Sequence, residues 1–182
     1  MLVAGEWLQR SASGRDKSAQ VDVRRANSAR VYDYWLGGKD NFASDRDAAE
    51  EAIGANPGIV EDARANRAFL GRAVSFLARD RGVRQFLDIG AGLPSGPNTH
   101  EIAQSIDPAA RVVYADNDPI VLAHARAMLV SGPDGRCGYV DADLRDPAII
   151  LKAAARTLDL NRPVALLLLL VLHLIPDEDG PH

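Results

Sequence analysis

The chain has 182 residues, of which 47% are hydrophobic and 25% charged, and its formal net charge is −4. This length suits one domain with a sizeable core. The mildly acidic balance excludes the basic surface that binding to nucleic acid or to an anionic membrane requires. The single cysteine, Cys137, excludes an internal disulfide framework and indicates a reducing cytosol.

No segment of the sequence is typical of export or membrane insertion. The N-terminal stretch "MLVAGEWLQRSASG" lacks the apolar core of a signal peptide. The apolar run at residues 164–175 covers twelve residues, whereas a membrane span needs ~20. We therefore expect a cytoplasmic protein that contacts neither membrane nor nucleic acid.

Composition and hydrophobic period divide the chain into three parts. Residues 1–20 are rich in serine, glycine and charge without a sustained period, which predicts a mobile tail. Residues 21–82 form a helical cap segment. Residues 83–182 alternate apolar strands with helices, which predicts an α/β fold with a Rossmann-like parallel sheet of about four strands and right-handed crossovers.

Within the cap segment three helices are expected. The first runs from Ser28 to the glycine pair that follows "ARVYDYWL", and the second begins at a capping box of Ser44 and Asp47. The third covers residues 59–80. The helical spacing of its apolar residues predicts that this third helix buries Ala65, Phe69, Ala73, Phe76 and Leu77.

The remaining part of the chain has four apolar runs that read as strands. They are "QFLDI" (85–89), "ARVVYAD" (110–116), "CGYVDA" (137–142) and "VALLLLLVL" (164–172). The last run is apolar on both faces, as a central parallel strand must be. Asn98 with Glu101, and Asp118 before Pro119, predict the starts of two of the intervening helices.

A G-x-G turn follows the first strand. Gly90 and Gly92 match the start of a nucleotide-binding turn, but the dinucleotide fingerprint needs a third glycine where the chain has Ser95. Pro94 and Pro97 remove backbone N–H donors and delay the next helix, so a pyrophosphate would be poorly bound. A cofactor held by its ribose and an amino-acid tail tolerates this turn, which favours S-adenosylmethionine over NAD.

Carboxylates follow the ends of the first three strands. Asp88 ends the first, Asp116 the second, and Asp141 and Asp143 follow the third. In parallel sheets ligands bind beyond these ends. Asp116 lies 24 residues after Gly92, and its carboxylate can accept hydrogen bonds from both hydroxyls of a ribose.

These motifs resemble a known family. "FLDIGAGLP", "VVYADNDPIVLAHAR" and "YVDADLRDP" are similar to the successive motifs of class I S-adenosylmethionine-dependent methyltransferases. "ARVYDYWLGGKDNFASDR" and "ARANRAFL" resemble an actinobacterial S-adenosyl methyltransferase family first catalogued as a domain of unknown function. The resemblance covers residues 24–182 and implies an enzyme that methylates an unidentified, small-molecule acceptor, with S-adenosyl-L-methionine as cofactor and no metal.

The resemblance also implies roles for individual residues at the strand ends. Asp88 and Gly90 would contact the amino-acid end of the cofactor, Gly92 would allow close backbone approach, and Asp116 would take the ribose hydroxyls. Around the adenine, the resemblance implies Asn117, Asp143 and Leu144, with Asp141 as the competing candidate for Asp143.

Further candidates come from the side chains themselves. Tyr34, with Trp35, could supply an aromatic face for the sulfonium cation, and Lys39 lies in a polar loop suited to closing over a small ligand. Either Arg64 or Arg67 could pair with the methionyl carboxylate. His173 is the candidate general base. For each, a structural role in the core, on the surface or at a strand end stays open.

The resemblance to class I methyltransferases implies a sheet of seven strands in the order 3-2-1-4-5-7-6. This sequence stops just after the fourth expected strand, which suggests a C-terminally shortened chain. Three functions stay open: a methyltransferase, a non-catalytic S-adenosylmethionine-binding module, and a nicotinamide-dependent oxidoreductase. Without a fifth strand, residues 164–172 would form an apolar edge. We therefore expect self-association through this segment.

Overall fold

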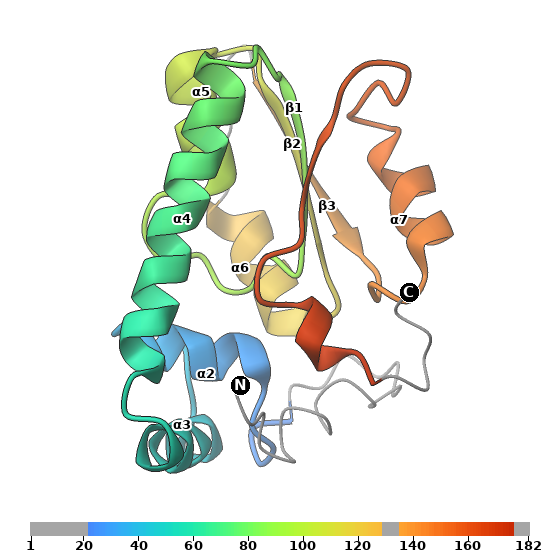
Figure 1. The fold of residues 1–182 in the computed structure, drawn as a ribbon. Helices are drawn as coiled ribbons and strands as arrows, with labels where there is room; N and C mark the ends of the chain where they lie inside the picture. Colours follow the sequence, from blue (N-terminus) through green and yellow to red (C-terminus); the bar gives the residue numbers. More distant parts are fainter. Residues whose placement is uncertain (1–21, 129–134, 177–182) are drawn as a thin grey trace.

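The protein is described by a computed structural model that covers residues 22–128 and 135–176, so the predicted tail at 1–20 lies outside the described residues. Four parallel strands form one sheet in the order β3-β2-β1-β4. The strands are β1 (Gln85–Ile89), β2 (Arg111–Asp116), β3 (Arg136–Asp141) and β4 (Ala165–Leu167). Figure 1 shows the sheet between α4 on one side and α7 on the other. The predicted α/β fold is confirmed.

Four helices accompany the sheet: α4 (Ile59–Arg79), α5 (Thr99–Ile106), α6 (Pro119–Met128) and α7 (Pro147–Ala154). Two of their starts form as the sequence predicts. A carboxylate oxygen of Glu101 accepts a 2.6 Å hydrogen bond from the backbone N–H of Asn98. The Asp118 carboxylate accepts one of 2.8 Å from the N–H of Ile120.

The central strand β1 divides the core into two layers. All five of its residues are buried, and successive side chains point to opposite faces. Phe86 packs among residues of α4 and α5, including Leu70 and Ala103. Leu87 and Ile89 pack on the other face, in a cluster that contains residues of α7. Both layers hold the carboxyl ends of β1 and β2 in fixed positions.

The cap segment consists of α2 (Ser28–Trp35), α3 (Ala43–Ala55) and the first turns of α4. A buried ion pair joins the first two helices, with Arg30 Nε 2.9 Å from Asp45 Oδ2. The same carboxylate accepts hydrogen bonds from the backbone N–H groups of Asn27 and Phe42. The predicted capping box of Ser44 and Asp47 is therefore wrong, because Asp45 takes this position.

The buried face of α4 differs from the prediction by about one residue. Its buried side chains are Ile59, Ala63, Leu70, Val74 and Ala78. Phe69 and Phe76, predicted as core, are 48% and 47% exposed, and each lies beneath an arginine guanidinium. The apolar period in the sequence predicts that α4 is amphipathic, but it does not fix which of its residues face the core.

No helix in the described ranges is both long enough and apolar enough to cross a membrane.

The fourth strand is much shorter than the predicted strand 164–172. It pairs with β1 only over three residues, and the last pair joins Leu167 to Asp88. Because β1 ends one residue later, at Ile89, the chain beyond Leu167 has almost no strand left to pair with. Leu170 instead adopts a left-handed backbone with φ 50°. A short 3-10 helix, η1 (Leu172–Leu174), follows.

Candidate functional site

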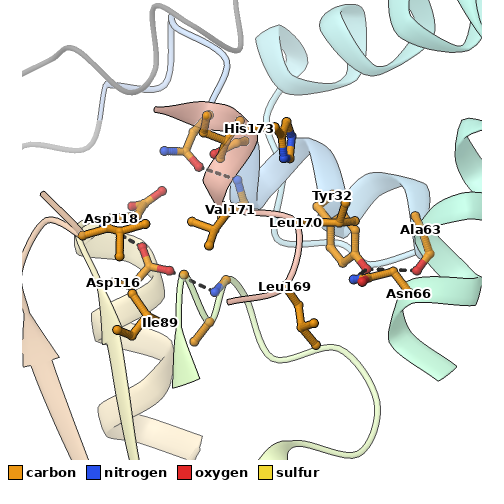
Figure 2. Close-up of a pocket in the computed structure, with 18 of the residues that line it drawn as sticks. Tyr32, Ala63, Asn66, Ile89, Asp116, Asp118, Leu169, Leu170, Val171 and His173 are labelled. Carbon is orange, nitrogen blue, oxygen red and sulfur yellow. Dashed lines mark hydrogen bonds between the residues drawn. The ribbon is translucent and has the colours of Figure 1, made fainter. Parts of the chain in front are cut away.

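A cavity of about 800 Å³ opens at the carboxyl ends of β1, β2 and β3. Its volume is in the range of small-molecule and cofactor sites. One wall is formed by the strand ends, a second by α2 with the ends of α3 and α4, and a third by residues 169–176. In the view of Figure 2, Asp116 and Asp118 lie on one side of the pocket and Tyr32 and Asn66 on the other.

The G-x-G turn has the backbone conformation that requires glycine. Gly90 and Gly92 have φ of 72° and 64°, in the left-handed region that side chains other than glycine rarely adopt. A Cβ atom at position 90 would lie 2.6 Å from Cγ2 of Val171. At position 92 the nearest atom would be the Cβ of Ala29, 4.0 Å away. The backbone of Gly92 is therefore open to close approach from the pocket.

Asp116 is connected to this turn through its carboxylate. One oxygen accepts a 2.9 Å hydrogen bond from the Gly92 N–H, and the other accepts one of 3.0 Å from the Asp118 N–H. Burial raises the pKa of Asp116 to about 6. Because each carboxylate oxygen has two lone pairs, both can still accept a hydrogen bond from a ligand.

Asp88, one strand away, is also buried and lines the pocket. The Thr99 hydroxyl donates a 2.6 Å hydrogen bond to its Oδ2. Burial raises the pKa of Asp88, while the Thr99 hydrogen bond and the nearby Arg67 guanidinium lower it. Because burial is the largest of these effects, a cationic ligand group beside the glycine turn would stabilise the charged form of Asp88.

At the end of β3 the structure distinguishes Asp143 from Asp141. Asp143 lines the pocket with Asn117 and Leu144, and Asp141 does not. Arg145 donates to both Asp143 oxygens, from Nε at 2.8 Å and from Nη2 at 2.6 Å, and these bonds lower the pKa of Asp143 to about 2. Asn117 Nδ2 adds a 3.2 Å hydrogen bond. The geometry favours Asp143 over Asp141 as the ligand-facing carboxylate.

Of the two candidate arginines, Arg67 lines this pocket and Arg64 does not. Arg67 Nε donates to the Ser95 carbonyl at 2.7 Å, and Nη2 donates to the Pro97 carbonyl and to Asn98 Oδ1. Arg67 thus holds the proline-containing loop in place from α4. These contacts make it a positioning residue for the turn, whether or not it also contacts a carboxylate.

The structure does not bring Tyr34 and Lys39 to the pocket. The Tyr34 hydroxyl instead donates a 2.6 Å hydrogen bond to Glu50 in an exposed position. Tyr32 and Trp35 are the aromatic residues of α2 that line the cavity, and their rings meet edge to face with centroids 6.5 Å apart. The aromatic wall that the sequence predicted at residues 34 and 35 thus comes from residues 32 and 35.

Asp118 is a pocket residue that the sequence identified only as a helix cap. Its Oδ1 performs that role, but Oδ2 is the one buried side-chain oxygen or nitrogen without a hydrogen-bond partner in the part of the chain that the structure describes. Burial raises the pKa of Asp118. An unsatisfied buried oxygen that lines a cavity indicates a missing donor. No sequence signal distinguishes it from an ordinary cap.

His173, the candidate base, lines the pocket from η1. In Figure 2 it lies between the carboxylate end and the Tyr32 end, above Val171 and Leu170. Partial burial lowers the pKa of His173 below its usual value. Burial thus favours the neutral form of the ring, which can accept a proton.

The comparisons with known proteins agree with this geometry. Residues 14–182 match the model of a family described as S-adenosyl methyltransferase. Among curated protein sequences none matches the chain. Two solved structures are similar: a DUF574 family protein from Streptomyces avermitilis MA-4680 (49% identity, TM-score 0.86) and a candidate methyltransferase from Thermobifida fusca YX (48% identity, TM-score 0.80).

The matches cover most of this chain but less of the relatives. They include 89% and 86% of the present chain, and 63% and 59% of the Streptomyces and Thermobifida chains. The chain therefore spans less than two thirds of the length of these two structures.

Proposed function

The chain belongs to the S-adenosyl methyltransferase family, and on that premise we propose that it binds S-adenosyl-L-methionine and transfers the methyl group to a small-molecule acceptor. The observation that carries the proposal is the hydrogen bond from Gly92 to the Asp116 carboxylate. It joins the two elements that hold a ribose-containing cofactor, the glycine turn after β1 and the acidic residue that ends β2.

The residues of the site fit this cofactor part by part. Asp116 has free lone pairs for the ribose hydroxyls, and Asp88 offers a carboxylate to the cationic end of the amino-acid tail. Asn117, Asp143 and Leu144 line the pocket near the ends of β2 and β3 and would surround the adenine. The open backbone at Gly92 allows the cofactor to pass close to the turn.

The proline-containing loop also fits a cofactor without a pyrophosphate. α5 begins at Thr99, nine residues after Gly90 in the sequence, so its N-terminal N–H groups do not open directly from the glycine turn. A pyrophosphate needs such donors. This arrangement supports S-adenosylmethionine and not a nicotinamide dinucleotide.

When bound, the cofactor supplies an activated methyl group, and the protein mainly has to position the acceptor. Tyr32 lies on the side of the cavity opposite Asp116 and Asp118 (Figure 2), and Trp35 contacts its ring edge to face. The two rings would hold the body of the acceptor. His173, which also lines the pocket, would accept a proton from the acceptor. We also propose that the protein is cytoplasmic.

Calorimetry tests the cofactor assignment directly. We expect S-adenosylmethionine and S-adenosylhomocysteine to bind, and NAD to bind more weakly than either. Tighter binding of NAD would overturn the assignment. Binding of S-adenosylmethionine without methyl transfer to any acceptor in a cell extract would favour a non-catalytic binding module.

A further inference from the structure

The end of the pocket formed by α2, α3 and α4 differs in its lining from the end formed by the strands. It is lined by aromatic and aliphatic side chains and by a small number of polar groups. In Figure 2 Tyr32, Ala63 and Asn66 lie together on the side away from Asp116, with Leu169 and Leu170 between. If the cofactor occupies the strand ends, this end is the place for the methyl acceptor, so the inference below rests on the proposed function.

One polar group at this end has a fixed orientation. The Tyr32 hydroxyl donates its only proton to the Ala63 carbonyl, at 2.9 Å. It can therefore only accept the hydrogen bond from Asn66 Nδ2, also 2.9 Å long. This contact defines which side of the amide is nitrogen. Asn66, which lines the pocket, has its oxygen left as an acceptor for a ligand.

The charged groups at this end are carboxylates. Glu51 on α3 and Asp62 on α4 both line the pocket and are exposed. Neither forms an ion pair or a side-chain hydrogen bond with another described residue. The two arginines of the pocket are engaged elsewhere, Arg67 with the loop at residues 95–98 and Arg145 with Asp143. Asp118, whose buried Oδ2 lacks a donor, lies at the other end of the pocket, beside Asp116 (Figure 2).

The negative charge at this end of the pocket disfavours an anionic acceptor. A carboxylate or phosphate group would meet the like charges of Glu51 and Asp62. After its bond to Tyr32, the Asn66 amide has one N–H left, a single neutral donor against two like charges. Burying an anion that is not paired with a cation is costly. A ligand that brings N–H donors and positive charge would instead satisfy both carboxylates and the Asn66 oxygen.

We propose that the methyl acceptor is an amine with an aromatic or aliphatic body, whose cationic nitrogen is attracted by Glu51 and Asp62 and oriented by the Asn66 oxygen. The body packs against Tyr32 and Trp35, where a cation can also lie over the rings. Electrostatic attraction at the mouth raises the local concentration of cations.

An ammonium must lose one proton before its nitrogen can be methylated, and His173 is the candidate base that accepts this proton. His173, which lines the pocket, would take one proton from the ammonium of the acceptor and become an imidazolium. With the cofactor bound, the lone pair of the nitrogen would then form a bond to the methyl carbon while the carbon–sulfur bond breaks and its electrons stay on sulfur. The products are S-adenosylhomocysteine and the N-methylated ammonium, and His173 releases its proton to water.

Two probes of similar size and opposite charge test this proposal. With the protein saturated by S-adenosylhomocysteine, 2-phenylethylamine and 3-phenylpropionate, which share a phenyl body and differ in the sign of their charge, are titrated by calorimetry. We expect the amine to bind at least roughly tenfold more tightly, or about 1.4 kcal/mol. Equal binding, tighter binding of the carboxylate, or binding of neither probe would overturn the proposal.

Variants separate the charge effect from general damage. The double variant Glu51→Gln, Asp62→Asn is expected to lose most of the preference for the amine and to retain its affinity for S-adenosylhomocysteine. Glu61→Gln, which removes an exposed carboxylate of α4 that does not line the pocket, should keep the preference. An unchanged preference in the double variant would show that these carboxylates do not select the acceptor.

S-adenosylhomocysteine is first titrated alone, which keeps the two proposals distinct. Failure of this titration contradicts the cofactor assignment. The probe pair is then compared without it, and the result still decides the charge preference of the pocket.

Discussion

The carboxylate of Asp116 accepts a 2.9 Å hydrogen bond from the backbone N–H of Gly92, a residue 24 positions earlier in the chain. This contact connects the end of β2 to the turn after β1. It holds the glycine turn against the strand that carries the candidate ribose ligand.

Substitution of Asp116 by alanine removes the acceptor for two ribose hydroxyls. Hydrogen bonds to charged groups contribute about 1.5–3 kcal/mol each, so we expect the affinity for S-adenosylhomocysteine to fall at least roughly tenfold. Calorimetry measures the change, and circular dichroism checks that the fold is retained. Asp141→Ala is the matched control, because Asp141 ends the neighbouring strand but does not line the pocket. Similar losses in both variants would contradict a direct role for Asp116.

The pH dependence of binding follows from the pKa of Asp116, which burial raises to about 6. Below this pH the carboxyl is protonated and loses acceptor capacity, so we expect affinity for S-adenosylhomocysteine to be roughly tenfold lower at pH 5 than at pH 8. Stability has the opposite sign: a raised folded-state pKa means that the contribution of Asp116 is present at low pH and is lost as pH rises through about 6. The Asp116→Asn variant should lack the binding transition, and a transition that persists there would assign it to another group.

The two glycines of the turn should respond differently to alanine. Both have a left-handed φ, which costs a side-chain-bearing residue about 1–2 kcal/mol. At position 90 the new Cβ would also lie 2.6 Å from Val171, while at position 92 the nearest atom is 4.0 Å away. Urea unfolding should therefore show a larger loss for Gly90→Ala, and Val171→Ala should partly restore only that variant. Equal losses would mean that the Val171 contact has no effect.

The buried ion pair between α2 and α3 predicts a strong effect of Asp45→Ala. Asp45 is fully buried and accepts hydrogen bonds from Arg30 and from two backbone N–H groups. Its loss leaves the buried Arg30 guanidinium without its counter-ion, at a cost of about 3–5 kcal/mol. Asp47→Ala, on an exposed position of the same helix, should change the unfolding free energy little. A loss below about 1 kcal/mol for Asp45→Ala would disagree with this account.

Self-association through the fourth strand stays a prediction, now for a shorter segment. Among the described residues β4 pairs only with β1, and Leu166 on it is 56% exposed. An unpaired strand edge can template pairing with a second copy, whereas a lysine on the edge opposes it. Light scattering should show association that Leu166→Lys reduces. A clean monomer at tens of micromolar would rule the prediction out.

The sequence by itself determined the architecture and the strand-end part of the site. Short apolar runs separated by glycine, proline and capping residues define strands and crossovers locally, because these residues restrict their own backbone. Once the strands are parallel, their carboxyl ends meet at one edge of the sheet. The sequence therefore predicts, without information on tertiary contacts, that three carboxylates meet at one pocket: Asp88, Asp116 and Asp143.

The tertiary structure alone decided which side chains of the helices face the pocket. An amphipathic period does not say what a helix packs against, so Tyr32 and not Tyr34 lines the cavity, and Phe69 is exposed. The short β4 depends on where β1 ends, and the contacts of Arg67 depend on a loop about 30 residues away. These outcomes arise from surfaces that meet only after folding, and a local sequence pattern holds no information on the partner surface.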